Sequence, residues 1–131
     1  MTIKPVDIKA ALAGRPVLRH RSPATPAAET AAAFAVLAGY RDGAVFAGSY
    51  AGDTAWERHG NGDELVQVLD GATTITILTP AGAESFTLTA GTLIIVPQGL
   101  WHRFHSPDGV TVLSMTPQPT EHSRADDPRT G

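Results

Sequence analysis

Short strand-like runs recur along the middle of this chain at intervals of about ten residues, and no other feature constrains the fold more. Each run is apolar or β-branched, and a turn signal rich in Gly, Pro or Asp follows it. The runs cover residues 34–38, 45–50, 65–69, 73–78, 85–88, 93–96, 102–105 and 110–116. No long helical period interrupts them, so the sequence predicts an all-β sandwich or barrel. The dipeptide Asp70-Gly71 predicts a tight hairpin between two of these runs.

The N-terminal part of the chain has a different pattern. Residues 6–14 predict a short helix that Asp7 caps and Gly14 ends. Residues 15–26 carry too many prolines and charges to favour regular structure. Residues 27–38 are rich in Ala, so a helix is an alternative to the strand predicted from residue 34.

These patterns divide the chain into one barrel domain and two flanking segments. Residues 1–32 form a short N-terminal extension, residues 33–117 the barrel domain, and residues 118–131 a flexible C-terminal tail. The tail prediction rests on the polar, Pro-rich composition of that segment. A chain of 131 residues leaves little room for a second domain.

Composition excludes several classes of protein. The absence of cysteine excludes a disulfide framework, a thiolate nucleophile and an iron–sulfur cluster. A formal net charge of -3 argues against a nucleic-acid partner, which would need a basic face. The longest apolar run, residues 31–39, is about half of the ~20 residues that a membrane span needs. Because the first residues also lack an apolar signal core, we expect a cytoplasmic protein without a membrane partner.

Ionisable residues lie on faces of the predicted strands that otherwise belong to the core. Glu57 and His59 are two apart, so they share one strand face and lie about 6.6 Å apart along it. After a glycine-rich turn, Glu64 begins a face that continues through Val66 and Val68. A carboxylate at the head of a core face is costly unless it has a partner.

A fourth polar residue can complete this group. His102 follows the turn at Pro97-Gln98-Gly99 and shares its strand face with Phe104. If His102 points inward beside the other three, two imidazoles and two carboxylates meet. That mixture suits one divalent transition metal such as iron, manganese, nickel or zinc.

At these residues the chain resembles the cupins, a family of double-stranded β-helix (jelly-roll) barrels that carry two sequence motifs. The second motif is present as Gly91-x5-Pro97-x-Gly99-x2-His102, with Ser106 where Asn is usual. The first is present as Glu57-x-His59-x4-Glu64-x6-Gly71, with Gly52 one residue nearer than the pattern expects. The resemblance implies a small single-domain cupin barrel with a short N-terminal extension.

The chain departs from the family pattern at its first ligand position, where Glu57 replaces a histidine. Carried over residue by residue, the resemblance implies the metal ligands Glu57, His59, Glu64 and His102. The extra anion should make the ion a weaker Lewis acid and favour harder metals. In a second interpretation, the other three residues form the two-His-one-carboxylate set of non-haem iron oxygenases, and Glu57 is a candidate base. A barrel that kept the fold and lost the ion is a further alternative.

The resemblance implies function only at the level of a class. Small cupins include dioxygenases, isomerases and decarboxylases, which implies metal-dependent chemistry on a small organic molecule. The alternative is a non-catalytic ligand-binding or sensory cupin, with or without metal. No residue stands out as catalytic beyond the metal set. The family also implies a homodimer, and the apolar residues Ile3, Val6, Ile8 and Leu12, outside the motifs, are suited to contact a second subunit.

Overall fold

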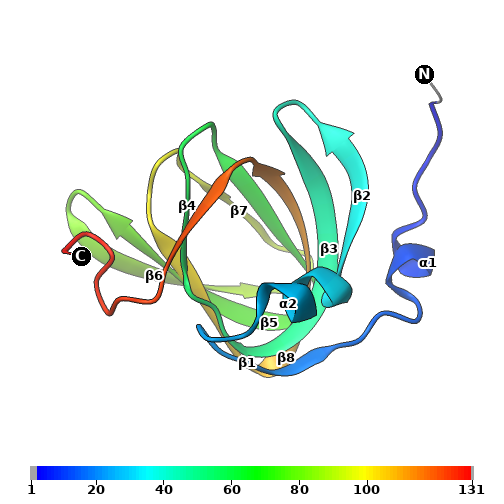
Figure 1. The fold of residues 1–131 in the computed structure, drawn as a ribbon, viewed down its shortest axis with the longest axis horizontal. Coiled ribbons are helices and arrows are strands. Elements are labelled where there is room, and N and C mark those ends of the chain that lie inside the picture. The colour runs from blue at the N-terminus through cyan, green and yellow to red at the C-terminus, as the bar shows by residue number, and fades with distance from the viewer. Residues whose placement is uncertain (1–2, 131) are drawn as a thin grey trace.

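The computed structural model describes residues 3–130, and strands make up most of it (Figure 1). Two short helices and nine strands follow one another along this part of the chain. They are α1 (Ile8–Leu12), β1 (Leu18–Arg21), α2 (Ala27–Ala33), β2 (Phe34–Tyr40), β3 (Gly43–Asp53), β4 (Trp56–His59), β5 (Glu64–Thr79), β6 (Gly82–Thr89), β7 (Leu93–Val96), β8 (His102–Pro117) and β9 (Thr120–Ser123). The predicted all-β architecture is confirmed.

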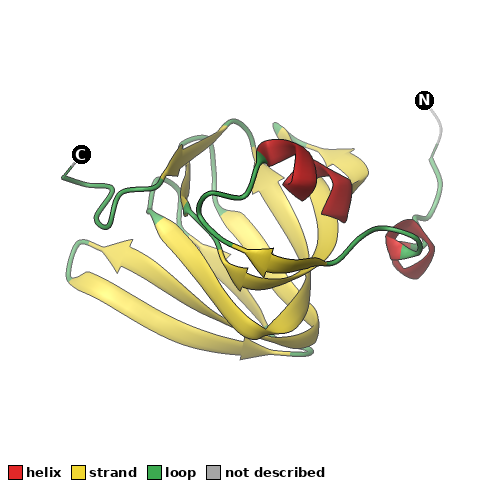
Figure 2. Cartoon of the chain, turned by 60° about the horizontal axis from the view of Figure 1, so that its bottom comes forward, coloured by secondary structure: helices red, strands yellow, loops and turns green. Residues whose placement is uncertain are grey.

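Two bent strands of 16 residues, β5 and β8, connect the two layers of the barrel (Figure 2). They pair antiparallel along their length, from Leu65 opposite Met115 to Ile77 opposite His102. Residues 64–67 at the start of β5 also pair with β7, and residues 72–79 pair with β6. Residues 105–117 of β8 pair with β3, which in turn pairs with β2, whereas the first residue of β8 pairs with β4. Each long strand therefore contributes to both layers.

Glycines accommodate the bend in these strands. The pairing register of β5 and β8 shifts around Gly71, and Gly71 and Gly109 have φ angles of 75° and 95°. A Cβ atom on Gly71 would lie 2.4 Å from the carbonyl oxygen of Gly109, so the two backbones meet where only glycine fits. The prediction of a hairpin at Asp70-Gly71 is wrong, because β5 continues through this dipeptide and Asp70 pairs with Thr111.

The core lies inside the barrel and follows the two-residue period of the strands. On β5, Val66, Val68, Ile75 and Ile77 point inward and are each at most 4% exposed. The cluster continues over neighbouring strands through Tyr50, Leu88, Val96, Phe104, Val110 and Val112. Each such aliphatic side chain stabilises the fold by about 1.5–3 kcal/mol when it leaves water. Polar residues buried at one end of this apolar interior are therefore candidates for a functional site.

The N-terminal segment is more regular than its composition indicates. Helix α1 forms as predicted, and the backbone N–H of Ala10 donates to the Asp7 carboxylate at 3.0 Å. The prediction of irregular structure over residues 15–26 is wrong for Leu18–Arg21, because β1 pairs in parallel with the end of β3. Both interpretations of the Ala-rich segment hold in part, since α2 ends at Ala33 and β2 begins at Phe34.

The C-terminal segment differs from the predicted flexible tail. Strand β9 pairs antiparallel with the free edge of β4, with Glu57 opposite His122 and His59 opposite Thr120. Beyond β9, the Asp126 carbonyl accepts a hydrogen bond from the buried Trp56 indole at 3.1 Å. The segment predicted as a tail thus includes a paired strand at Thr120–Ser123. Residues 1, 2 and 131 lie outside the described residues.

Neither helix within residues 3–130 has the length and apolar character that a membrane-spanning helix requires.

Candidate metal centre

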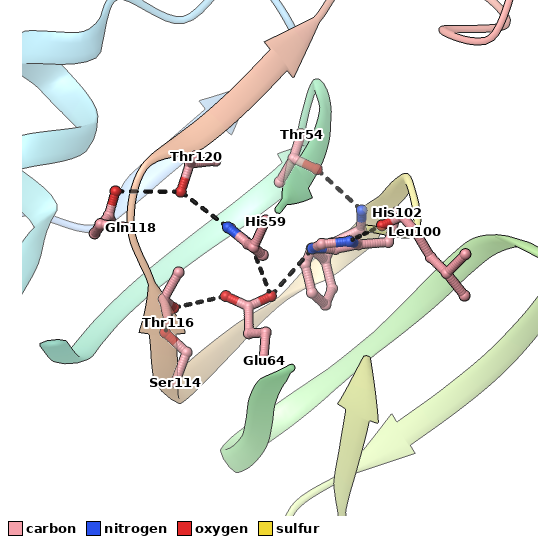
Figure 3. Close-up of polar contacts among 10 residues, drawn as sticks. Thr54, His59, Glu64, Leu100, His102, Ser114, Thr116, Gln118 and Thr120 are labelled. Atoms are coloured by element: carbon pink, nitrogen blue, oxygen red, sulfur yellow. Dashed lines mark hydrogen bonds and ion pairs between the residues drawn. The ribbon is translucent and has the colours of Figure 1, made fainter. Parts of the chain in front are cut away.

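Three strands bring the ends of three buried polar side chains together at one end of the barrel (Figure 3). His59 is the last residue of β4, Glu64 the first of β5 and His102 the first of β8. Their exposed fractions are 2%, 5% and 0%, respectively. The Glu64 Oε1 atom lies 3.3 Å from the Nε2 atom of His59 and 3.1 Å from that of His102.

Hydrogen bonds between two loops hold these strand ends in place. The β4–β5 turn and the turn before β8 contact each other through Gly99, whose N–H donates to the His59 carbonyl at 2.9 Å. The Gln98 N–H donates to the Asp63 carboxylate at 2.8 Å, and its side-chain amide donates to the Gly60 carbonyl at 2.7 Å. Gly99 has a φ of 81°, in agreement with the turn predicted there. Both cupin-like motifs are thus connected at the site.

The remaining nitrogen of each imidazole sets the tautomer of its ring. The Nδ1 atom of His102 lies 3.1 Å from the Leu100 carbonyl, which can only accept, so Nδ1 carries the proton. The Nδ1 atom of His59 lies 3.0 Å from the Thr120 hydroxyl. That hydroxyl can accept a hydrogen bond from His59 while its own O–H points toward the Gln118 side-chain oxygen, 3.5 Å away. Both Nε2 atoms therefore direct a lone pair toward Glu64, the arrangement of metal-ligating histidines.

The Glu64 carboxylate is held by contacts at both of its oxygens. Its Oε2 atom accepts a hydrogen bond from the Thr116 hydroxyl at 2.6 Å, and Oε1 faces the two rings. Burial alone would raise the pKa of Glu64, but the adjacent His102 and His59 rings outweigh it and lower this pKa to about 2. Burial likewise opposes charge on His102, yet Glu64 raises its pKa overall. The carboxylate is thus ionised at neutral pH.

The converging atoms lack partners of their own. Among the described residues, His59 Nε2, Glu64 Oε1 and His102 Nε2 are the buried side-chain nitrogen and oxygen atoms without a hydrogen bond of acceptable geometry. Nitrogen and oxygen atoms that meet in this way in a buried space require a positive charge between them, which a metal ion or, without metal, a proton on His102 supplies. Ligands about 2.1 Å from an octahedral ion lie roughly 3 Å apart, close to the spacing here. A cation fits this arrangement.

Glu57 lies beside the same histidine pair but in a less buried position. It precedes His59 by two residues on β4 and is opposite His102 in the β4–β8 pairing. One of its carboxylate oxygens and a nitrogen of each histidine all lie within 4.8 Å of one another. The structure therefore places both predicted carboxylates next to both predicted histidines, with Glu64 in closer contact and Glu57 half-buried.

A cavity of about 670 Å³ opens beside these residues, and Glu57 and Glu64 both line it. Its apolar walls include Phe46, Val66 and Phe104. A small organic molecule could therefore contact the candidate metal centre and an apolar surface at the same time.

Sequence analysis missed the two threonines that hold the ligand side chains. Thr116 shares its strand face with the core residues Val110 and Val112, so the two-residue period could have identified it. Thr120 lies in the segment predicted as a tail, and no local pattern indicates that it pairs with His59.

A sequence-family model described as a cupin domain matches residues 49–116, just over half of the chain. The chain belongs to the cupin family. The matched segment begins near the end of β3 and ends with β8, so it contains the strands that carry all four predicted ligands. No curated protein matches this cupin in sequence.

Solved structures with the same fold include several metal-dependent enzymes. A hydroquinone 1,2-dioxygenase in complex with Cd²⁺ and 4-hydroxybenzonitrile is 18% identical, with a TM-score of 0.55 over 64% of this cupin and 63% of that chain. Oxalate decarboxylase from Bacillus subtilis, described with Mn(II) centres, is 16% identical, with a TM-score of 0.54 over 60% and 23% of the two chains. A cupin-2 domain protein from Shewanella frigidimarina is 22% identical, with a TM-score of 0.51 over 69% and 79%.

This cupin spans less than two thirds of the length of the dioxygenase and about a quarter of the decarboxylase. At these identities the likeness shows a shared fold.

Proposed function

We propose that this cupin binds one divalent transition metal through Glu57, His59, Glu64 and His102 and acts on a small organic molecule. The observation that carries the proposal is the convergence of three buried, unpartnered atoms from three strands. The contacts of the two Nδ1 atoms support it, because Leu100 and Thr120 favour the tautomer of each ring that a metal ligand needs.

The donor set limits the metal to a few candidates. Imidazole and carboxylate ligands together suit iron, manganese, nickel or zinc. Such an ion, when bound, supplies Lewis-acid or one-electron chemistry at the wall of the cavity. Two carboxylates in place of one reduce the positive charge of the site, which favours the harder ions of this group.

The reaction class that we propose is that of a dioxygenase- or isomerase-type metalloenzyme. An apolar cavity beside a candidate metal centre supports chemistry on a small organic substrate. The alternative is a non-catalytic ligand-binding or sensory cupin, which would bind the same kind of molecule without turnover. Oxygen uptake and substrate conversion by the metal-loaded protein distinguish the two.

Metal analysis of protein purified without chelators tests the proposed centre. We expect a stoichiometric ion in the wild type and its loss in His59→Ala and His102→Ala. The matched control is His105→Ala, because His105 lies three residues further along β8, points outward and pairs with Asp53 at the surface. A metal-free wild type that also fails to bind added iron, manganese or zinc would contradict the proposal.

The role of Glu57 needs a separate variant. Glu57→Gln keeps the shape of the side chain and removes its charge. If Glu57 is a ligand, the variant loses metal affinity by about tenfold or more, as expected when a charged donor is lost. If Glu57 is a base, the variant retains its metal and loses turnover.

The homodimer and the cytoplasmic location stay predictions from the sequence and the family. The half-exposed Val6 and the largely exposed Ile3 leave the N-terminal segment available to a second subunit.

A further inference from the structure

Strand β1 contributes one arginine to the lining of the cavity, and this residue lies outside the family motifs. Arg21 is the last residue of β1 and lines the cavity together with Glu57 and Glu64. Its guanidinium carbon lies 4.5 Å from the ring centre of Tyr50 and 5.4 Å from that of Phe34. Both distances are within the range of cation–π contact.

The backbone of Arg21 is fixed by a close approach to β3. Arg21 pairs with Gly52, which has a φ of 115°. A Cβ atom on Gly52 would lie 2.2 Å from the Arg21 carbonyl oxygen, so β1 could not reach this position beside any other residue. The strand positions the base of the side chain, and the two aromatic rings position its charged end.

The guanidinium has no partner within the part of the chain that the structure describes. Arg58 and Arg129 form ion pairs with Glu121 and Asp127, whereas residues 3–130 offer the Arg21 guanidinium neither an ion pair nor a hydrogen bond. Burial raises the pKa of Tyr50 to about 12, so this ring is a neutral phenol and does not neutralise the arginine. The N–H donors of a rigidly placed cation thus remain available to a ligand.

We propose that Arg21 anchors a carboxylate group of the molecule that this cupin binds. A guanidinium matches a carboxylate through two parallel hydrogen bonds. The apolar walls formed by Phe46, Val66 and Phe104 suit a hydrophobic body next to that group. The ligand class is therefore a small organic acid. Its carboxylate would contact Arg21, and its apolar body would lie along the cavity wall. This proposal narrows the small organic molecule of the proposed function to a chemical class, but the anchor itself does not depend on the metal.

The charges around the cavity favour a monoanion over a dianion. Arg21 and Arg124 are the arginines that line it, and they balance Glu57 and Glu64. Arg124 is exposed and, among residues 3–130, has no aromatic partner, whereas Arg21 is half-buried against two rings, so Arg21 is the better-placed anchor. One planar guanidinium is enough to bind a carboxylate, whereas the negative charges of the two glutamates would repel a phosphate dianion.

Binding of benzoate and of benzamide, its neutral counterpart of similar shape, tests the proposal. We expect isothermal titration to show that the wild type binds benzoate about tenfold or more tightly than benzamide, the effect of one charge-assisted anchor. Arg21→Met should remove this preference and leave benzamide binding unchanged, which shows that the cavity is intact. Arg21→Lys should retain only part of the preference, because lysine lacks the fork.

Two controls separate Arg21 from other sources of the effect. Arg19→Gln removes a positive charge from the same strand at an exposed position and should leave the preference unchanged. His102→Ala and chelated wild type lack the metal, and the preference for benzoate should persist in both. A preference that disappears with the metal would place the carboxylate on the ion and overturn the proposal.

Other outcomes also overturn it. Equal affinity for benzoate and benzamide, or no binding of either, excludes a carboxylate anchor, and tighter binding of phenyl phosphate than of benzoate indicates a phosphate site. If the wild type holds no metal but keeps its Arg21-dependent preference, the proposed metal function fails and the anchor stands.

Discussion

The hydroxyl of Thr120 decides which nitrogen of His59 faces the candidate metal centre. Thr120 can accept from Nδ1 at 3.0 Å while its own hydroxyl donates to the Gln118 side-chain oxygen at 3.5 Å. Partners of this kind orient a ligand ring and raise its basicity. Because Thr120 lies on β9 and His59 on β4, the contact also depends on the pairing of these two strands.

Replacement of this hydroxyl should weaken metal binding without removing a ligand. Thr120→Val keeps the shape of the side chain, and we expect metal affinity to fall by about 10- to 100-fold. Competition with a chromophoric chelator measures the change. The matched control is Thr76→Val, because Thr76 contacts Ser85 at 2.8 Å on the exposed side of the sheet. Equal affinities of Thr120→Val and the wild type would show that Thr120 does not position the ring.

At this scale, much of the candidate site follows from sequence spacing. The two-residue period placed Glu57 and His59 on one face, and the position of Glu64 before Val66 indicated an inward carboxylate. The supporting residues are less accessible to such reasoning. Thr120 is 61 residues from its partner, and only the register of β9 on β4 brings the two together.

At the scale of elements, the bend shared by β5 and β8 depends on two facing glycines. Gly71 has a φ of 75°, and a Cβ atom there would meet the Gly109 carbonyl oxygen at 2.4 Å. The contact lies between two backbones, so no side-chain rotation can relieve it. The strands can cross here only if this position carries no side chain.

Substitution at this crossing should cost more than backbone strain alone. Gly71→Ala adds a steric clash to the strain of a positive φ, and we expect the free energy of unfolding to fall by roughly 3 kcal/mol or more. Gly91→Ala is the matched control, because Gly91 has a φ of 90° and no atom of the described residues lies within 4 Å of its Cβ position. That variant should lose only about 1–2 kcal/mol in denaturant unfolding. Equal losses would show that the backbones separate easily.

The elements also show where sequence reasoning reaches its limit. The apolar runs located most strands, because a buried strand face must be apolar wherever it lies. The Asp70-Gly71 signal was misleading, because a positive φ serves a bend within a strand as well as a hairpin turn. Strands β1 and β9 were missed because both are polar edge strands, whose formation depends on a free edge of β3 or β4.

At the scale of the whole molecule, the buried Glu64–His102 pair links stability to pH. The pKa of Glu64 falls from 4.5 to about 2 on folding, so its stabilising contribution is present above pH 4.5 and is lost as pH falls toward 2. The pKa of His102 rises from 6.5, so its contribution is complete below pH 6.5 and is lost as pH rises through the higher folded value.

Metal-free protein should therefore be most stable between about pH 4.5 and 6.5. On the acid side, the loss should be on the order of 3 kcal/mol at most, since one pKa unit corresponds to about 1.4 kcal/mol. Urea unfolding in the presence of a chelator measures the loss of stability on the acid side and on the alkaline side of this range. Glu64→Gln should reduce both losses, and the surface variant His105→Ala should retain them. A wild-type profile that is flat across this range would contradict the assignment.

The two layers share β5 and β8 as continuous strands, and this has a consequence for access to the interior. A hinge motion that separates the two layers would have to disrupt the pairing of both strands at their bends. Strands β1 and β9 both contribute residues to the cavity, so their positions, rather than a hinge between the layers, shape the space open to a ligand.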